Sequence, residues 1–243
     1  LSVAGVDPTR ESKKLGHVIG VQLQTSGLPD GISSMEAMKF FCTYQGIAPR
    51  YDLLDRLGLV ENKRLPYHAL STGQKRRLAL ALSVAHNPPV LFLDEPTAGL
   101  DVASRNDLHN LMRELQASGT TILLATHDMA EAEIMADRVA ILLQGGIAAI
   151  GTPLEITATG SGLTKVSVCT ANRALQQPEL FIPAVQNRTV KEEYIVYYST
   201  DIALTVSAII AHIQTQADTI IDLRVERPSL EDRFLEITNT GVK

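Results

Sequence analysis

One short apolar run constrains the fold of this chain more than any other feature. Residues 90–93 read Val-Leu-Phe-Leu, follow the breaker Asn-Pro-Pro, and end in two adjacent carboxylates, Asp94 and Glu95. A run of this length between turn residues is typical of a strand buried on both faces, as in parallel sheets. Ligands of open α/β sheets bind at the carboxyl ends of such strands, so the two acids mark a candidate site.

The surrounding segments alternate between strand and helix patterns. We expect strands at 18–24, 121–125 and 139–143, another short strand after the glycines at 145 and 146, and helices over 108–115 and 129–136. Strands that alternate with helices predict a parallel sheet built from right-handed βαβ units. Two shorter apolar segments, 78–84 and 202–213, are interpreted as buried core helices.

Two regions flank this α/β core. Residues 31–70 show helical segments at 34–44 and 50–57 without a strand-like run, which indicates a helical insertion. After residues 159–162 the pattern changes to strand-like runs mixed with helical stretches, the runs being 165–169, 194–198 and 220–225. We therefore predict an α/β fold with a parallel-sheet core, a helical subdomain and a small C-terminal α/β domain, divided at about 157–164.

Composition narrows the functional classes. The net charge is −5, so the chain offers no basic face for nucleic acid. No apolar run reaches the roughly 18–20 residues of a membrane-spanning helix. Two distant cysteines, Cys42 and Cys169, suit buried thiols in a reducing compartment. These features predict a cytosolic protein, or one that is held at a membrane by a partner.

Further chemistry-bearing residues cluster around the acidic pair. Adjacent strand side chains diverge, so one of the two acids could hold a hydrated Mg²⁺ while the other acts as general base for a water. An isolated Asp-Glu pair could also be two solvated acids at the end of a strand. Leu-Ser-Thr-Gly-Gln at 70–74 leads directly into a helix, and the hydroxyl of Ser71, the close approach allowed by Gly73 and the free N–H groups of a helix start favour a phosphate. A simple helix cap would explain Ser71 alone. His127 follows the next strand and is expected at the same sheet edge.

Together these strings resemble the motifs of ATP-binding cassette (ABC) ATPases. Residues 70–74 resemble the signature motif, with Thr72 where many members have glycine, and 91–95 resemble the Walker B strand with its catalytic glutamate. Residues 98–101, which end in Asp101, resemble the D-loop, His127 the switch histidine and Gln24 the Q-loop glutamine. The five occur in family order over about residues 1–155. The tail, 224–235, is similar to the closing segment of the drug-resistance type of bacterial exporter ATPase.

The resemblance implies a P-loop NTPase-like fold, an ATPase domain over 1–156 with a helical subdomain at about 31–75, and an accessory domain over 165–243. It implies ATP and Mg²⁺ as cofactors, a homodimer or heterodimer of such subunits, and a permease of the ABC-2 class that holds the protein at the inner face of the cell membrane. We expect export of a drug, lipid or polysaccharide.

The same resemblance implies the roles of the site residues. Ser71, Gly73 and Gln74 would contact the γ-phosphate that the other subunit holds. Glu95 would polarise the attacking water, His127 would contact the γ-phosphate, and Asp94 would hold Mg²⁺. The two remaining residues are Gln24, expected to bind ATP and Mg²⁺ and to signal to the helical region, and Asp101, expected to couple the two sites.

The family's phosphate-binding loop, Gly-x-x-x-x-Gly-Lys-Ser/Thr, does not occur in these 243 residues. In the family it would precede the present start, in a segment of roughly 50–70 residues. We therefore expect this chain alone neither to bind nor to hydrolyse ATP appreciably. Two alternatives stay open: a non-catalytic partner that donates only its signature face, and a cassette ATPase of DNA repair or translation.

Overall fold

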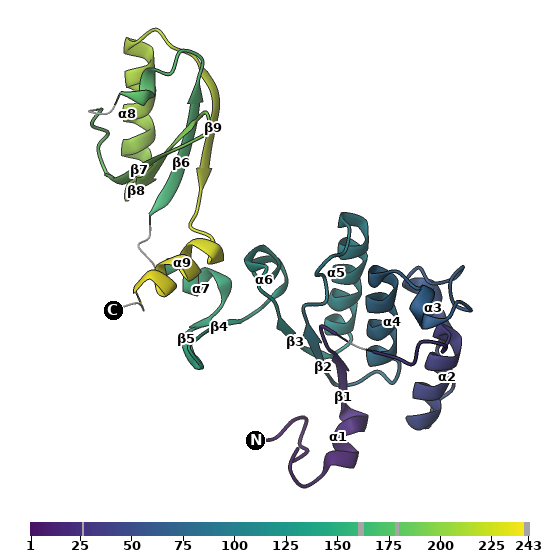
Figure 1. The fold of residues 1–243 in the computed structure, drawn as a ribbon. Helices are drawn as coiled ribbons and strands as arrows, with labels where there is room; N and C mark the ends of the chain where they lie inside the picture. The colour runs from purple at the N-terminus through teal and green to yellow at the C-terminus, as the bar shows by residue number, and fades with distance from the viewer. Residues whose placement is uncertain (26, 160–162, 178–179, 241–243) are drawn as a thin grey trace. The chain divides into compact units, whose positions relative to one another are not determined.

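The computed structural model describes residues 1–25, 27–159, 163–177 and 180–240. The chain divides into two compact units, Leu1–Asp128 and Met129–Lys243 (Figure 1). Of the expected domain boundary at 157–164, residues 160–162 lie outside the described residues. The predicted domain bounds stay a prediction.

The first unit is an α/β layer with a helical insertion. Its elements are α1 (Ser12–Val18), β1 (Ile19–Gln22), α2 (Ser34–Tyr44), α3 (Tyr51–Arg56), the 3₁₀ turn η1 (Tyr67–Ala69), α4 (Thr72–Val84), β2 (Val90–Asp94), α5 (Val102–Ala117) and β3 (Thr121–Ala125). The three strands form a parallel sheet in the order β1-β2-β3. The helices at 34–44 and 50–57 are confirmed as α2 and α3.

One face of this sheet packs against helices. Gly20 and Gln22 of β1 and Leu91 and Leu93 of β2 are buried, and α4 contacts β1 while α5 contacts β3. The opposite face is more open, with Leu123 58% exposed. Gly20 allows the close packing, since a Cβ there would lie only 2.1 Å from the carbonyl oxygen of Ser83 on α4.

The second unit holds two sheets. Its elements are α6 (Met129–Met135), β4 (Val139–Leu143), β5 (Gly146–Gly151), α7 (Pro153–Ala158), β6 (Thr164–Thr170), the 3₁₀ turn η2 (Ala174–Gln176), β7 (Val185–Lys191), β8 (Tyr194–Ser199), α8 (Ile202–Thr215), β9 (Ile220–Glu226) and α9 (Leu230–Thr240). β4 and β5 form an antiparallel hairpin, and the other strands form an antiparallel sheet in the order β7-β8-β6-β9.

Each sheet of this unit has its own core. Val166, Ile195 and Tyr197 of the four-stranded sheet pack with Ile209 and Ile213 of α8. Around the hairpin, Ile141, Ile156 and Leu230 form a second cluster, because α9 returns to contact α6 and α7. The tail is therefore a packed helix that joins the hairpin layer.

Four expectations need correction. The strand at 139–143 was expected in the parallel sheet, but the structure pairs it antiparallel with β5. The strand at 18–24 is shorter: Val18 ends α1, and Gln24 lies two residues beyond β1. The segment 202–213 is not a fully buried helix, because Ile202 and Leu204 of α8 are exposed. A strand at 185–191, β7, was not expected. The two buried free thiols are confirmed.

Candidate functional site

Glu95 and His127 lie in contact at the carboxyl ends of β2 and β3. Asp94 lies beside Ala125 in the register of these strands, and the backbone N–H of Glu95 donates to the carbonyl of Ala125 at 2.9 Å. Glu95 Oε1 accepts the backbone N–H of His127 at 2.8 Å and lies 2.7 Å from its Nδ1. The expectation that His127 lies at the same sheet edge as Asp94 is confirmed, and the structure adds its contact with Glu95.

The backbone of Glu95 adopts a conformation that is uncommon for a residue with a side chain. Its φ is +49°, in the left-handed region. This bend carries the chain off β2, and the hydrogen bonds to Ala125 and His127 hold it. Such strained residues cluster at functional sites, where the surrounding structure determines them. The side chain of Glu95 is 15% exposed and that of His127 81% exposed.

Asp94 and Gln24 are the candidate Mg²⁺ ligands. Asp94 is half-buried, and no residue in the described ranges forms a hydrogen bond or ion pair with its carboxylate. Gln24 is exposed. Mg²⁺ in nucleotide sites takes one or two protein carboxylates plus phosphates and waters, so a single free carboxylate fits it. In the part of the chain that the structure describes, no cluster of three or more His, Cys, Asp or Glu could hold a metal by itself.

The signature-like segment begins α4 with a capping box. Ser71 Oγ accepts the backbone N–H of Gln74 at 3.2 Å, and Gln74 Oε1 accepts the N–H of Ser71 at 2.9 Å. Helix capping therefore explains Gln74 as well as Ser71. The hydroxyl proton of Ser71 and the NH₂ group of Gln74 remain available for an anion. Gly73 faces the next motif, since a Cβ there would lie 3.5 Å from Leu100 Cδ2.

Asp101 also caps a helix. Its Oδ1 accepts the backbone N–H of Ser104 at 2.9 Å and its Oδ2 accepts the Ser104 hydroxyl at 2.8 Å, at the start of α5. These hydrogen bonds, that from the backbone N–H first, lower the pKa of Asp101 below its usual range. Asp101 is thus an ionised carboxylate at a helix N-terminus, where negative charge is stabilised.

The structure brings only some candidates together. Glu95 and His127 are in direct contact, and Asp94 adjoins them in the chain. Within the described residues, no hydrogen bond joins Glu95 to Gln24, Ser71 or Gln74. Hydrogen bonds therefore join the candidates in two groups, Glu95 with His127 at the sheet edge and Ser71 with Gln74 at the start of α4.

Three residues of the first unit that carry buried polar groups were not identified by the sequence analysis. Gln22 is only 3% exposed, and Arg76 and Arg77 on α4 each bury part of a guanidinium group. The signal in the sequence is Gln22, a glutamine at a position of β1 that faces the helices. An inward glutamine is informative because a buried amide needs partners.

Comparisons with known proteins agree with these motifs. Residues 35–133 match the model of the family described as "AAA domain, putative AbiEii toxin, Type IV TA system". Nod factor export ATP-binding protein I of Ralstonia nicotianae is 34% identical over 93% of this chain and 72% of that protein. Linearmycin resistance ATP-binding protein LnrL of Bacillus subtilis is 27% identical over 100% of this chain and 81% of that protein.

A solved structure supports the same fold. "Structure of ATP binding subunit of ABC transporter" superimposes with a TM-score of 0.60 at 25% identity, covering 64% of this chain and 67% of that chain. The α/β fold with its parallel sheet and helices matches that of an ABC ATPase. The motif order, the Glu95–His127 contact and the relatives agree, and the chain belongs to the ATP-binding subunits of ABC transporters of the drug-resistance type.

Proposed function

We propose that the intact protein hydrolyses ATP to power export through a membrane permease of the ABC-2 class. The observation that carries the proposal is the contact between Glu95 and His127 at the ends of two parallel strands. Membership of the family supports it, since the named relatives are ATP-binding proteins of export and resistance systems. The exported molecule belongs to the drug, lipid or polysaccharide class.

The geometry of Glu95 suits a general base. Both hydrogen bonds from His127 end on Oε1, which leaves Oε2 for an attacking water. A carboxylate held at one oxygen is oriented toward the water without losing its basic lone pairs. His127 positions Glu95 and contacts the γ-phosphate. Catalysis of this kind comes mainly from positioning and charge stabilisation.

Asp94 and Gln24 would hold Mg²⁺ with the nucleotide. The bound ion supplies positive charge against the phosphate oxygens. Asp94 keeps its carboxylate free at the end of β2, beside the Glu95–His127 pair. Gln24, in the exposed segment after β1, contacts the nucleotide and relays its presence toward the helical insertion.

The start of α4 offers a second phosphate contact. N–H groups at a helix start and the hydroxyl of Ser71 favour an anion, and Gly73 leaves the backbone approachable. Ser71, Gly73 and Gln74 would bind the γ-phosphate held by a second subunit in a homodimer or heterodimer. Asp101, at the start of α5, couples the two sites across that dimer.

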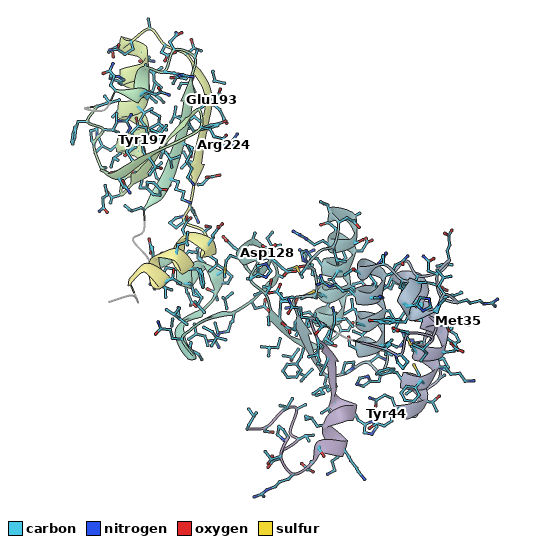
Figure 2. The ribbon with its side chains drawn as sticks, viewed as in Figure 1. Met35, Tyr44, Asp128, Glu193, Tyr197 and Arg224 are labelled. Carbon is cyan, nitrogen blue, oxygen red and sulfur yellow. The ribbon has the colours of Figure 1, made fainter. Side chains whose placement is uncertain are left out.

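The helical insertion carries the proposed permease contact. Phe40, Phe41, Tyr44 and Ile47 are exposed at the C-terminal half of α2 and just beyond it (Figure 2 labels Tyr44). Exposed aromatic and aliphatic side chains gathered at one end of a helix favour a protein partner. Among the described residues no helix is long and apolar enough to cross a bilayer. We place the protein in the cytoplasm, at the inner membrane face through its permease.

Two alternative functions can each be weighed against the proposed one by a single observation. The sequence holds no Gly-x-x-x-x-Gly-Lys-Ser/Thr loop, so this chain by itself should neither bind nor hydrolyse ATP, which suits a signature-donating partner subunit. Against that alternative, Asp94, Glu95 and His127 are all present. A non-transport cassette ATPase is less well supported, because the insertion between Gln24 and Ser71 is compact.

The test is Glu95→Gln in the protein isolated from its own cells. The amide keeps one carbonyl oxygen for the His127 N–H but removes the base, so ATP turnover should be nearly abolished while the closed, ATP-bound dimer still forms. Glu114→Gln, at an exposed glutamate that pairs with Arg56, is the matched control and should keep wild-type turnover. Turnover of the Glu95 variant within a few-fold of wild type would refute the role of Glu95.

A further inference from the structure

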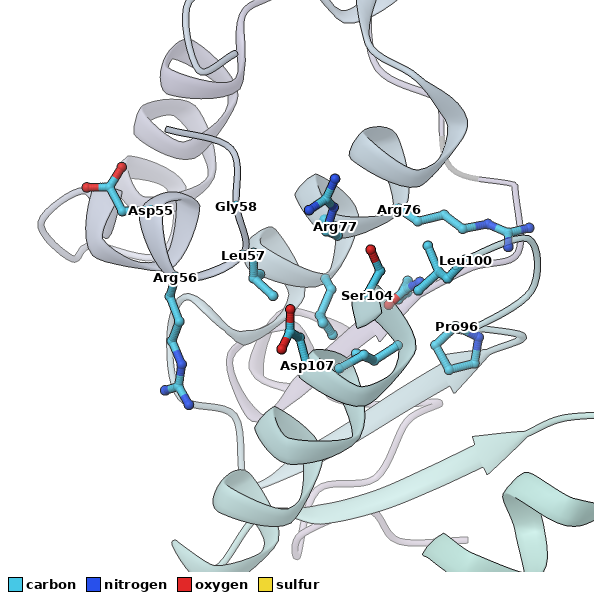
Figure 3. A pocket seen from close by; sticks show the side chains of 13 residues that line it. Asp55, Arg56, Leu57, Gly58, Arg76, Arg77, Pro96, Leu100, Ser104 and Asp107 are labelled. Carbon is cyan, nitrogen blue, oxygen red and sulfur yellow. The ribbon is translucent and has the colours of Figure 1, made fainter. Parts of the chain in front are cut away.

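A cavity lies inside the first unit, next to the start of α4 but apart from the Glu95–His127 pair. It has a volume of about 120 Å³ and lies between α4, α5 and the segment that follows β2 (Figure 3). Leu57, Leu80 and Leu100 form part of its apolar wall. Its polar lining includes Gln22, Arg76, Arg77, Ser104 and Asp107.

Gln22 leaves an unmet hydrogen-bonding group in this cavity. The residue is 3% exposed, and in the described part of the chain nothing donates to its carboxamide oxygen. Buried polar side-chain atoms in folded proteins nearly always have a partner, either protein or a bound molecule. The carboxamide oxygen of Gln22 can therefore accept a hydrogen bond from a molecule bound in the cavity.

The two arginines leave unmet donors. Arg76 Nη1 and Arg77 Nε are buried, and within the described ranges neither has an acceptor. Glycines make room for both guanidinium groups: a Cβ at Gly58 would lie 2.8 Å from Arg77 Nη1, and one at Gly99 would lie 3.6 Å from Arg76 Nη1. Both glycines have positive φ, so other residues there would be strained.

The charge of the lining is positive. Asp55 pairs with Lys63, and Arg56 pairs with Glu114 outside this set. That leaves Arg76 and Arg77 against the carboxylate of Asp107. The Arg76 side chain extends past Leu100, away from Arg77 (Figure 3), so a small ligand in the cavity must accept from Arg77 and donate to the Gln22 amide oxygen.

We propose that this cavity binds a small oxyanion that carries a hydroxyl group, of which hydrogen phosphate is the example. Its charged oxygens accept from Arg77 in charge-assisted hydrogen bonds, and its hydroxyl donates to Gln22. The volume equals that of about four liquid waters, which is enough for a tetrahedral oxyanion. Phosphate is also a product of the proposed ATP hydrolysis, but the binding test does not depend on that reaction.

The test is a titration of ¹⁵N-labelled protein with inorganic phosphate at constant ionic strength, followed by NMR. The expected result is saturable shifts of the Gln22 side-chain NH₂ and the Arg77 Nε–H signals. Gln22→Leu and Arg77→Gln should each raise the dissociation constant for phosphate at least tenfold. Arg77→Lys, which keeps the charge, guards against a variant that fails to fold and should bind more tightly than Arg77→Gln.

One control variant separates this cavity from phosphate contacts on the surface. Arg113→Gln alters an exposed arginine on α5, the helix that carries Ser104 and Asp107 of the cavity lining, and should leave the affinity unchanged. The turnover test with Glu95→Gln leaves the cavity intact, so the two proposals can fail independently. Sulfate, which has no hydroxyl at neutral pH, should bind at least tenfold more weakly than phosphate. The proposal would be overturned if sulfate bound as tightly as phosphate or if all variants had the same affinity. It would also be overturned if no saturable shift appeared, as expected for a cavity that holds only water.

Discussion

The close packing of α4 on β1 makes Gly20→Ala a strong test of the fold that positions the site. The added Cβ would lie 2.1 Å from the Ser83 carbonyl oxygen and 2.9 Å from both Leu91 Cδ1 and Pro88 Cγ. The first of these atoms belongs to the backbone of α4 and cannot rotate away. The strand and the helix must therefore separate.

The size of the effect follows from that distance. Ordinary van der Waals contact of a Cβ begins at 3.4 Å, so α4 must move by about 3.4 − 2.1 = 1.3 Å relative to β1. Overpacking a core costs about 1–3 kcal/mol and more where backbone must shift. We expect Gly20→Ala to lower the free energy of unfolding of the first unit by about 3 kcal/mol or more.

Two buried cysteines allow each unit to be followed separately. Cys42 is buried in the first unit and Cys169 in the second, and both are free thiols. Pulsed alkylation across a urea series, quantified for each cysteine by mass spectrometry, gives two unfolding curves. Gly20→Ala should move the Cys42 curve to lower urea and leave the Cys169 curve in place.

Gly16→Ala is the matched control. Gly16 lies inside α1, and no atom lies within 4 Å of the position of an added Cβ. Alanine in a helix interior is favoured over glycine by about 0.5–1 kcal/mol, so this variant should be neutral or slightly stabilising. If Gly20→Ala shifts the Cys42 curve by less than about 1 kcal/mol, or shifts both curves equally, the packing argument is wrong.

Three further predictions concern single side chains. Burial acts to raise the pKa of Asp218, but backbone N–H groups of Ala174, Asn172 and Thr219 outweigh it and lower the pKa to about 2. The stabilisation is therefore complete above about pH 4 and lost as the pH falls toward 2, so Asp218→Asn should destabilise at pH 7 and match wild type near pH 2 in circular-dichroism melts. Tyr197→Phe removes a buried hydroxyl that has no partner among the described residues, and its urea midpoint should stay the same or rise. Ser71→Ala removes the cap of α4 and should cost about 1 kcal/mol by the Cys42 curve; an unchanged curve would argue against the capping box.

Sequence patterns predicted the elements whose signal is local. The strand at 121–125 and the helix at 34–44 match β3 and α2 because their apolar spacing and boundary residues are contained in the segment itself. The position of His127 at the same sheet edge as Asp94 was also predictable. It follows from a general property of parallel sheets, in which neighbouring strands end at the same edge.

Elements whose state depends on distant partners were predicted poorly. β7 is mostly polar on both faces and lies at the edge of its sheet, so its sequence carries no alternation. α1 buries no residue and shows no apolar stripe. The turn at 145 and 146 is visible in the sequence, but the apolar run of β4 does not show which strand it pairs with. In the structure Gln144 and Gly145, with φ of +51° and +79°, form a two-residue turn that pairs β4 with β5.

The two motifs proposed to face a second subunit are tied together by packing rather than by a shared hydrogen bond. Gly73 at the start of α4 lies against Leu100, and Arg76 one turn later lies against Gly99, so the segment before α5 packs on the first turns of α4. Each of these two helices is also capped by a side-chain oxygen that accepts a backbone N–H. Ser71 caps α4 and Asp101 caps α5. A side chain already fixed by its cap loses little further freedom when it meets a phosphate. The caps therefore hold Ser71 and Asp101 in place for the proposed dimer contact. The helix-capping role and the proposed binding role of these two residues are compatible.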